Sequence, residues 1–222
     1  MNAFHYFSDL ESRLESHANK DLATPMAKYM KNHFEYYGIK APLRKQILME
    51  FKKENGLLEG KEINEFVYLC WDHPCREVQY CCMDIVEREK NREQERIELY
   101  EWMVLHKSWW DSVDFIAANS FGKIFQEYPQ MITEKTPAYM QSNELWLQRT
   151  ALLFQLKYKT QTNLPLLFNY CEMLADHPDF FIRKAIGWAL RQAGRYYPQE
   201  VMAFVNNTEL SQLSRREALK HL

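Results

Sequence analysis

Two tryptophans and two carboxylates lie close together near the middle of the 222-residue chain, in the segment Lys107-Ser-Trp-Trp-Asp-Ser-Val-Asp114. On a helix, Trp110 and Asp114 would share one face, because they are four residues apart. An acid beside a large aromatic is costly to bury, but it can line a cleft. There, Asp114 could stabilise a developing cation or position a water molecule, with Trp110 as an apolar wall. The alternative is that Trp110 belongs to the core and Asp114 is a solvated or capping acid.

Two further positions could contact a charged ligand. Arg149 could bind a phosphate through two parallel hydrogen bonds, and the alternative is an ion pair between neighbouring structural repeats. Trp188 would share a helix face with Lys184 and Arg191, at spacings of four and three residues. An indole flanked by cations suits a groove that meets sugar rings beside a phosphate backbone. Gly187 costs a helix about 1 kcal/mol relative to alanine, which indicates close approach of another backbone or a ligand.

Signals for other chemistry are weak. Tyr29, next to Lys28, is favoured as a core residue with a hydrated hydroxyl. Cys70 and Cys75 flank His73, but no second ligand pair follows, so we expect no metal site. The chain has no glycine-rich phosphate loop and no serine-hydrolase motif, and we expect no cofactor. Its five cysteines, an odd number, indicate reduced thiols.

The elements that must position these residues are helices. The chain has only six glycines and eight prolines and is 46% hydrophobic, which is enough for a core. Helix formers are plentiful, and no run of alternating β-branched residues is present. We expect Pro25, Pro42 and Pro198 at first helical positions and a capping box at Ser214 with Glu217. The sequence predicts helices over residues 3–17, 25–36, 42–55, 62–72, 76–91, 93–106, 109–119, 120–127, 130–141, 143–159, 164–176, 180–197, 198–206 and 214–222.

A repeated pattern indicates how these helices pack. A charged residue, any residue and then a small or β-branched apolar residue opens one helix of each pair. The spacings between copies are 31, 35, 38, 34 and 33 residues, typical of the helix-pair unit of an α-solenoid. We therefore predict an all-α fold, a single domain over residues 1–222, built as a curved solenoid of HEAT-like repeats with a basic concave face. The copies are Lys45-Gln-Ile, which is looser, Arg76-Glu-Val, Asp111-Ser-Val, Arg149-Thr-Ala, Arg183-Lys-Ala and Arg216-Glu-Ala.

Charge is unevenly distributed along the chain. Residues 147–222 contain ten Lys and Arg against six Asp and Glu, a net charge of +4, while residues 1–146 contain 18 against 24, a net charge of −6. The total of −2 therefore conceals a basic C-terminal third, which favours a polyanionic partner. Where the other copies of the repeat carry a base, one carries Asp111, followed by Asp114. A carboxylate in the middle of a basic groove indicates that the bound polyanion is also acted on.

The sequence also bounds the cellular setting. The first residues lack the basic start and apolar run of a secretory signal, and no stretch of about 18 apolar residues is present. We expect a cytoplasmic monomer without membrane attachment.

The three central and C-terminal segments Lys107–Asp114, Leu145–Lys159 and Phe180–Trp188 resemble the AlkD-type DNA alkylation repair glycosylases. Pro25–Phe34 with Gly38-Ile39, and Arg215–His221, resemble signatures near the ends of that family's chain. The resemblance implies a HEAT-like α-solenoid that cradles duplex DNA and excises cationic N3- and N7-alkylated purines, without flipping the lesion into a pocket. The chain would then be a monofunctional glycosylase of base excision repair.

The resemblance also implies roles for individual residues. Trp110, Asp114 and Trp188 match the family's catalytic-cleft residues, and Arg149 matches an arginine linked to DNA binding and activity. Tyr29 matches a residue near the lesion-bearing backbone. Together with the basic residues around these motifs, the expected DNA-binding set is Tyr29, Lys28, Lys107, Arg183, Lys184, Arg191, Arg215 and Arg216.

The implied chemistry agrees with the residues. A cationic alkylated purine needs no general acid to leave, and Asp114 could stabilise the oxocarbenium-like sugar and orient the attacking water. The π faces of Trp110 and Trp188 could favour the same positive charge. One alternative is a non-catalytic HEAT-like solenoid that binds bent or branched DNA. Another is a solenoid that binds proteins, which predicts no salt-dependent DNA affinity.

Overall fold

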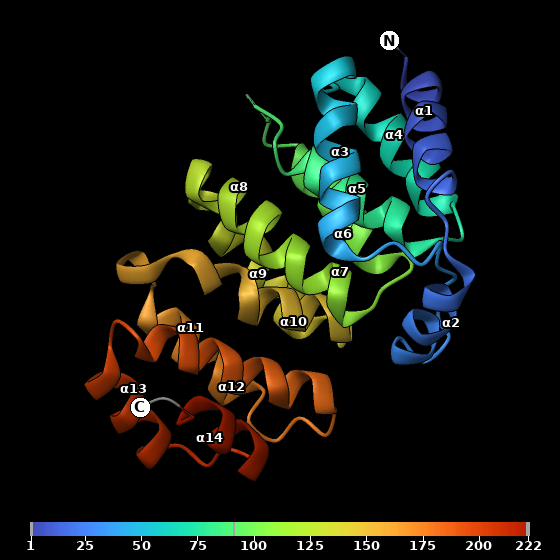
Figure 1. Ribbon diagram of the computed structural model, residues 1–222. Helices are drawn as coiled ribbons and strands as arrows, with labels where there is room; N and C mark the ends of the chain where they lie inside the picture. Colours follow the sequence, from blue (N-terminus) through green and yellow to red (C-terminus); the bar gives the residue numbers. More distant parts are fainter. Residues whose placement is uncertain (1, 91, 221–222) are drawn as a thin grey trace. The chain divides into compact units, whose positions relative to one another are not determined.

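The computed structural model describes residues 2–90 and 92–220 and confirms the all-α class. Within those ranges there is no β-strand, only an isolated bridge between Glu35 and Cys75. The chain divides into two compact units, Met1–Glu93 and Gln94–Leu222, which are treated separately below (Figure 1). The assignment of the whole chain to one domain stays a prediction. Residue 91 and residues 221–222, at the ends of two predicted helices, lie outside the described residues.

In its described residues, 2–90 and 92–93, the first unit has five helices, and four of them pack side by side. Tyr6 lies in the core of this unit with its ring against Phe51 and Phe66, at 4.6 and 5.2 Å between ring centroids. Both contacts are edge to face, the arrangement that aromatic quadrupoles favour. The elements are α1 (Ala3–Glu15), α2 (Lys20–Tyr29), α3 (Ala41–Asn55), α4 (Lys61–Asp72) and α5 (Arg76–Val86), and α1, α3, α4 and α5 form the packed group.

The structure corrects the prediction that a helix begins at Pro25. Helix α2 begins five residues earlier, at Lys20, because the side chain of Asn19 accepts hydrogen bonds from the amides of Asp21 and Leu22. The proline therefore lies inside the helix. The helix ends at Tyr29 rather than near residue 36, and the chain turns through left-handed backbone conformations at residues 31 and 32.

A buried carboxylate anchors the segment that follows α2. Glu77 is fully buried on α5, and it accepts hydrogen bonds from the amides of Tyr37, Gly38 and Ile39 at 2.9–3.1 Å. Gly38 has a φ of +88°, and a β-carbon there would lie 2.1 Å from the carbonyl oxygen of Asn19. Only glycine fits this crossing, because both the backbone conformation and the space exclude a side chain.

The second unit contains two series of helices that alternate along the chain. One series is α7 (Trp110–Phe115), α10 (Leu145–Leu153), α12 (Phe180–Gly194) and α14 (Gln212–Ala218), and its successive members contact one another. The other series is α6 (Arg96–Leu105), α9 (Gln130–Gln141), α11 (Leu164–Met173) and α13 (Pro198–Asn207). The helices of the first series are the ones that the repeated motif opens, from Asp111 to Arg216 (Figure 1).

Contacts between residues about one repeat apart hold the series of α6, α9, α11 and α13 together. Lys135 of α9 lies 3.0 Å from Glu101 of α6, and these residues are 34 positions apart. The hydroxyl groups of Thr136 and Tyr170, also 34 positions apart, are 2.5 Å from each other. Phe204 of α13 stacks on Phe168 of α11 with ring centroids 4.2 Å apart. The predicted solenoid of helical repeats is confirmed, whereas its curvature and basic concave face stay predictions.

Several predicted helix bounds in this unit differ from the structure, and three differences change how the chain is built. The predicted helices 109–119 and 120–127 form one helical run, in which a π-helical turn, η1 (Ile116–Phe121), joins α7 to α8 (Gly122–Glu127). The predicted helix 143–159 ends at Leu153 and continues as two 3₁₀ turns, Phe154–Lys157 and Lys159–Gln161. The expected capping box at Ser214 is wrong, because Ser211 is the N-cap and accepts a hydrogen bond from the Ser214 amide.

Among the described residues, no helix is long and apolar enough to cross a membrane.

Candidate active site

Helix α7 begins directly after a tight turn. Lys107 has a φ of +46° in that turn and is exposed, and Ser108 donates a hydrogen bond back to the carbonyl of Val104 in α6. The helix then begins at Trp110, which is half-buried, with Trp109 as its N-cap. This local geometry places Trp110 and Asp114 on the first turns of α7, as their spacing predicts.

Asp114 forms a two-point ion pair with Arg149 of the next helix in the series, α10. The Nε of Arg149 lies 2.7 Å from Oδ1 of Asp114, and its Nη2 lies 2.9 Å from Oδ2. The arginine side chain is 5% exposed and the aspartate side chain 15%. The two residues are 35 positions apart, so the pair links neighbouring repeats. Two parallel hydrogen bonds fix the orientation of the carboxylate more firmly than a single contact would.

Burial and the ion pair act on Asp114 in opposite directions. Loss of solvent raises the pKa of the Asp114 carboxyl, while hydrogen bonds from Arg149 and its positive charge lower that pKa, and the negative charge of Asp111 adds a small increase. Burial has the larger effect, so the pKa of Asp114 lies above its ordinary value. A carboxylate in this state remains basic and poorly solvated, which makes its charge effective toward a nearby cation.

The third nitrogen of Arg149 connects the pair to α12. Its Nη1 donates a hydrogen bond to the backbone carbonyl of Phe181, in the first turn of that helix. The Phe181 ring lies against Trp109 and Trp146, with ring centroids 5.1 and 5.3 Å away. All three nitrogens of the guanidinium are therefore engaged by protein groups, and the expected role of Arg149 as a phosphate clamp stays a prediction.

The π-helical turn begins at Ile116, two residues after Asp114. Within it, Asn119 donates from its side-chain nitrogen to the carbonyl of Phe115 at 2.6 Å. Its side-chain oxygen accepts a hydrogen bond at 2.5 Å from Lys157, which lies just after α10. In such turns some backbone carbonyls do not form the regular α-helical hydrogen bond. Turns of this kind occur often at functional sites. Here a side chain satisfies one of these carbonyls and ties the turn to the next repeat.

Trp188 lies half-buried in the middle of α12, on the same face as Lys184 and Arg191. Both cations bind one carboxylate of α14: Lys184 Nζ lies 3.1 Å from Oε1 of Glu217, and Arg191 Nη1 lies 3.0 Å from Oε2. Gly187 lies between them, and a β-carbon there would be 2.5 Å from the β-carbon of Glu217. The predicted close approach at Gly187 is confirmed, and the approaching element is helix α14.

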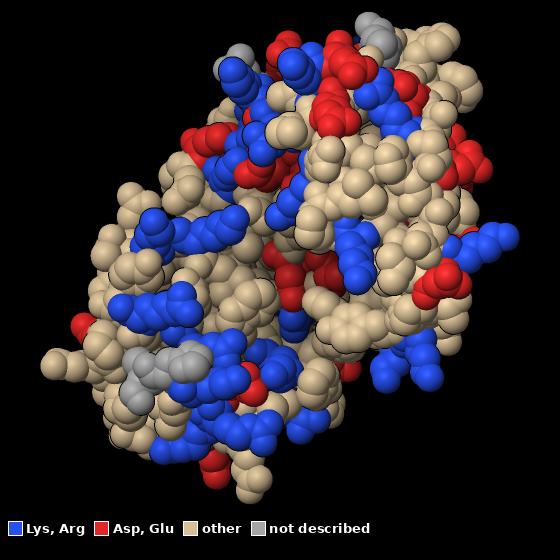
Figure 2. Space-filling view, viewed as in Figure 1, with Lys and Arg blue, Asp and Glu red and all other residues tan. Residues whose placement is uncertain are grey.

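The remaining basic residues of the predicted DNA-binding set have different surroundings. Arg183 donates to the carbonyl of Pro178 at 2.7 Å, just before α12. Arg215 donates to the carbonyl of Val205 and the side chain of Asn206, at the end of α13. Arg216 is exposed on α14. On the face of the molecule shown in Figure 2, Lys and Arg side chains gather over the C-terminal helices.

Lys28 and Tyr29 lie at the end of α2, in the first unit. The Tyr29 side chain is 72% exposed, so the expectation that it is a core residue is wrong. Tyr29 is the last residue of the helix, and its ring lies at the surface.

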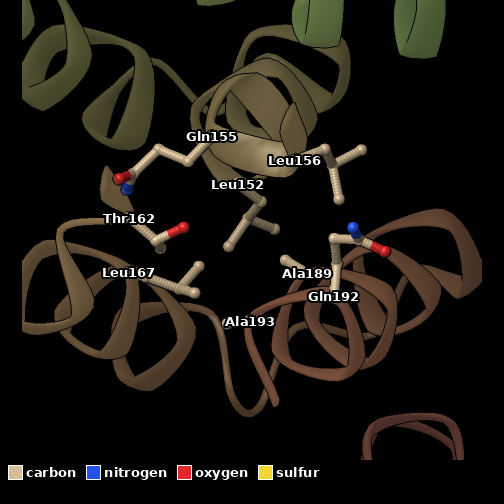
Figure 3. A pocket seen from close by; sticks show the side chains of 8 residues that line it. All are labelled: Leu152, Gln155, Leu156, Thr162, Leu167, Ala189, Gln192 and Ala193. Atoms are coloured by element: carbon tan, nitrogen blue, oxygen red, sulfur yellow. The ribbon is translucent and has the colours of Figure 1, made fainter. Parts of the chain in front are cut away.

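A small cavity of the second unit is separate from this chemistry. A cavity of about 10 Å³ lies between α10, α11 and α12 (Figure 3), and its lining is uncharged. This volume is about the size of one water molecule. Among residues 2–90 and 92–220, no group of three or more His, Cys, Asp or Glu could hold a metal ion.

The sequence indicated Glu217 only as part of a capping box, and it predicted neither the contact with Phe181 nor the π-helical turn. Glu217 could have been found, because Glu217 and Lys184 each follow the first residue of a repeat copy and are 33 positions apart. The carbonyl of Phe181 leaves no signal in the sequence, since every residue has one.

Comparison with known proteins adds an independent line of information. The model of a family described as DNA alkylation repair enzyme matches residues 10–222. A solved structure described as a predicted DNA alkylation repair enzyme from Enterococcus faecalis is similar, with a TM-score of 0.83 and 31% sequence identity. The alignment covers 92% of this chain and 96% of that one. No curated protein matches this chain.

Proposed function

The chain belongs to the DNA alkylation repair enzyme family, and from that premise we propose that it is a monofunctional DNA glycosylase. Its substrates are cationic N3- and N7-alkylated purines in duplex DNA, and it hydrolyses the bond between such a base and its deoxyribose. The protein acts in the cytoplasm as a monomer and is nucleoid-associated when it is bound to DNA. It needs no metal or cofactor for this reaction.

The observation that carries the proposal is the Asp114–Arg149 pair. Breaking the bond between C1′ and the base returns its electron pair to the cationic purine, which leaves as a neutral base. Positive charge then develops on C1′ and the ring oxygen of the sugar. A fixed carboxylate at Asp114 stabilises that charge without reorganising, which is where enzymes gain most of their electrostatic effect. Water then adds to C1′, and its proton passes to Asp114 or to solvent.

Arg149 is proposed to support the reaction through Asp114. Its two-point hydrogen bonding holds the carboxylate in one orientation and favours the ionised form (2.7 and 2.9 Å). We assign the indoles of Trp110 and Trp188 to the sugar, where their π faces favour a growing positive charge. The lesion is not flipped into a pocket in this mechanism, because the purine is already a good leaving group.

The basic residues of the second unit are proposed to bind the phosphate backbone. Lys107 and Arg216 are exposed, and Arg183, Lys184, Arg191 and Arg215 lie on the helices around Trp188. We place Lys28 and Tyr29 of the first unit on the lesion-bearing strand. Contacts with phosphate and sugar carry little sequence information, so base sequence around the lesion matters little and affinity falls steeply with salt.

The test is excision from duplex DNA that carries a single N7-methylguanine. We expect the native protein to release free base and leave an abasic site. Asp114→Asn keeps the shape of the side chain and removes its charge, and we expect it to bind DNA normally while the excision rate falls about 100-fold or more. Asp111→Asn is the matched control, because it removes the same charge one turn away on the same helix. Excision by Asp114→Asn at the native rate would refute the mechanism.

One observation favours a second candidate function. A buried ion pair 35 residues apart is also what a purely structural contact between repeats looks like. In that case the protein would be a non-catalytic solenoid that binds bent or branched DNA. It would then bind the lesion duplex, release no base in any form, and lose thermal stability with Asp114→Asn.

A further inference from the structure

Glu217 places one negative charge between two cations that the proposed function assigns to DNA. It is 15% exposed, whereas the Lys184 side chain is 37% exposed and that of Arg191 is 21% exposed. A lysine ammonium has three N–H donors and an arginine guanidinium has five, so the contacts with Glu217 leave donors of both side chains for another acceptor. Both cations are therefore accessible to a phosphate, while the acid that holds them lies beneath.

The position of Glu217 is fixed by the backbone and not by its own side chain. Helix α14 contacts α12 at Gly187, where the carbonyl of Ser214 would lie 2.8 Å from an added β-carbon. The hydroxyl of Ser214 also donates to the carbonyl of Arg183 at 3.0 Å. This close packing keeps the carboxylate beside the Lys184–Trp188–Arg191 face whether or not the cations remain bound to it.

We propose that Glu217 is an internal competitor for the DNA backbone. In the unbound protein it holds Lys184 and Arg191, and on binding it gives up one or both to phosphate. Glu217 thereby limits affinity and speeds release of the product duplex, which carries the same phosphates as the substrate. The inference rests on the proposed function, because it requires DNA to bind at the α12 face that contains Trp188.

Competition of this kind has a measurable signature in the salt dependence of binding. When a cation moves from Glu217 to a phosphate, DNA releases counterions, but the abandoned carboxylate gathers some again. The net release is then smaller than for a cation that was previously free. Replacing Glu217 by glutamine removes this compensation, so the plot of log affinity against log salt becomes steeper, by up to about 0.9 per phosphate contact.

The experiment compares the full-length native protein, Glu217→Gln and Glu209→Gln. Dissociation constants and dissociation rates are measured on undamaged duplex and on product duplex with an abasic site, between about 50 and about 200 mM salt. We expect Glu217→Gln to bind both duplexes several-fold more tightly at low salt, to dissociate more slowly and to show the steeper slope. Glu209 is exposed in the loop before α14, and Glu209→Gln makes the same change in net charge, so we expect it to keep the native slope.

Each outcome separates this inference from the proposed function. If Glu217→Gln matches Glu209→Gln in slope and dissociation rate while the native protein excises base, the inference is wrong and the proposed function stands. Weaker binding by Glu217→Gln would also overturn it, because the acid would then be positioning the cations for DNA. If the native protein shows no salt-dependent DNA binding, the proposed function itself fails. Should Glu217→Gln prove unfolded by circular dichroism, Glu217→Ala decides the question by the same measurements.

Discussion

Two ion-pair clusters of the second unit connect neighbouring repeats in the same way but differ in how their cations meet solvent. Asp114 pairs with Arg149 across 35 residues, and Glu217 pairs with Lys184 across 33. The carboxylate side chains are equally exposed, at 15%, but the arginine is 5% exposed and the lysine 37%. Contacts of the same kind between neighbouring repeats thus give one pair with a buried cation and one pair with an exposed cation.

The pKa values of the two acids reflect this difference. Burial raises the pKa of Asp114 above its ordinary value despite the hydrogen bonds from Arg149. Hydrogen bonds from Lys184 and then Arg191, with their charges, lower the pKa of Glu217 despite some loss of solvent. In a desolvated pair the cost of burying charge dominates, whereas in a hydrated cluster the attraction dominates. In the proposed function, the first contact supports the chemistry and the second adjusts DNA binding.

The largest expected effect comes from removing the buried cation alone. Arg149→Met leaves the Asp114 charge buried without a partner, and we expect a loss of about 3–5 kcal/mol in the free energy of unfolding at neutral pH. The double variant with Asp114→Asn removes the orphaned charge and should recover much of that loss. Urea unfolding of both proteins measures the difference, beside Glu217→Gln, for which we expect a loss below about 1 kcal/mol. Equal stability of the single and double variants would mean that the buried pair is not coupled.

An intermediate effect is expected from Gly187→Ala. The added β-carbon would meet the Glu217 β-carbon at 2.5 Å and the Ser214 carbonyl at 2.8 Å, so α14 must move away from α12. We expect a loss of about 1–3 kcal/mol, after the gain in helix propensity that alanine brings. The melting temperature measures this loss.

Gly122→Ala is the matched control for that change, because its β-carbon would meet the Phe154 carbonyl at a similar 2.8 Å. Both variants should have a lower melting temperature than the native protein. Only Gly187→Ala should also change the salt dependence of DNA binding, since it moves Glu217. A change of the same size in both variants would show that general loosening, and not the position of Glu217, sets that dependence.

The smallest expected effect concerns the pH dependence of stability. As pH falls, Asp114 and Glu217 change the stability of the fold in opposite directions. The pKa of Glu217 is lower in the folded state, so its contribution is present above the ordinary glutamate pKa of 4.5 and is lost as pH falls through the folded value. The pKa of Asp114 is raised, so the folded state takes up this proton first and gains stability as pH falls toward 3.8. Melting temperatures measured across this acidic range test both signs. As pH falls, the difference in melting temperature between the native protein and Glu217→Gln should become smaller. The melting temperature of the native protein should rise relative to that of Asp114→Asn.

The excision rate should follow the same titration of Asp114. In the proposed mechanism the ionised carboxylate of Asp114 stabilises the sugar cation. The excision rate should therefore fall on the acid side of its pH profile, at a higher pH than an ordinary aspartate would give. The Glu217→Gln variant should show the same fall in excision rate at acidic pH as the native protein.

The amino-acid sequence by itself determined the class of fold and the spacing of its repeats. Helix formers, few glycines and a motif that recurs at near-constant intervals are local properties. They already specified the helices whose first turns contain Asp111, Arg149, Arg183 and Arg216. The sequence also singled out Asp114, Arg149 and Trp188 by residue type. It placed the start of α2 wrongly, because Asn19 competes with Pro25 as a helix start and the cap is decided by local hydrogen bonds.

Only the tertiary structure decided which charges face each other. The sequence offered Arg149 as either a phosphate ligand or a contact between repeats, and the structure places it on Asp114 and the carbonyl of Phe181. It also placed Glu217 against Lys184 and Arg191 through the packing at Gly187. An ion pair depends on distance and on exclusion of water, and both are set by how helices far apart in sequence pack together. Residue type and spacing could nominate these side chains, but their pairing follows from that packing alone.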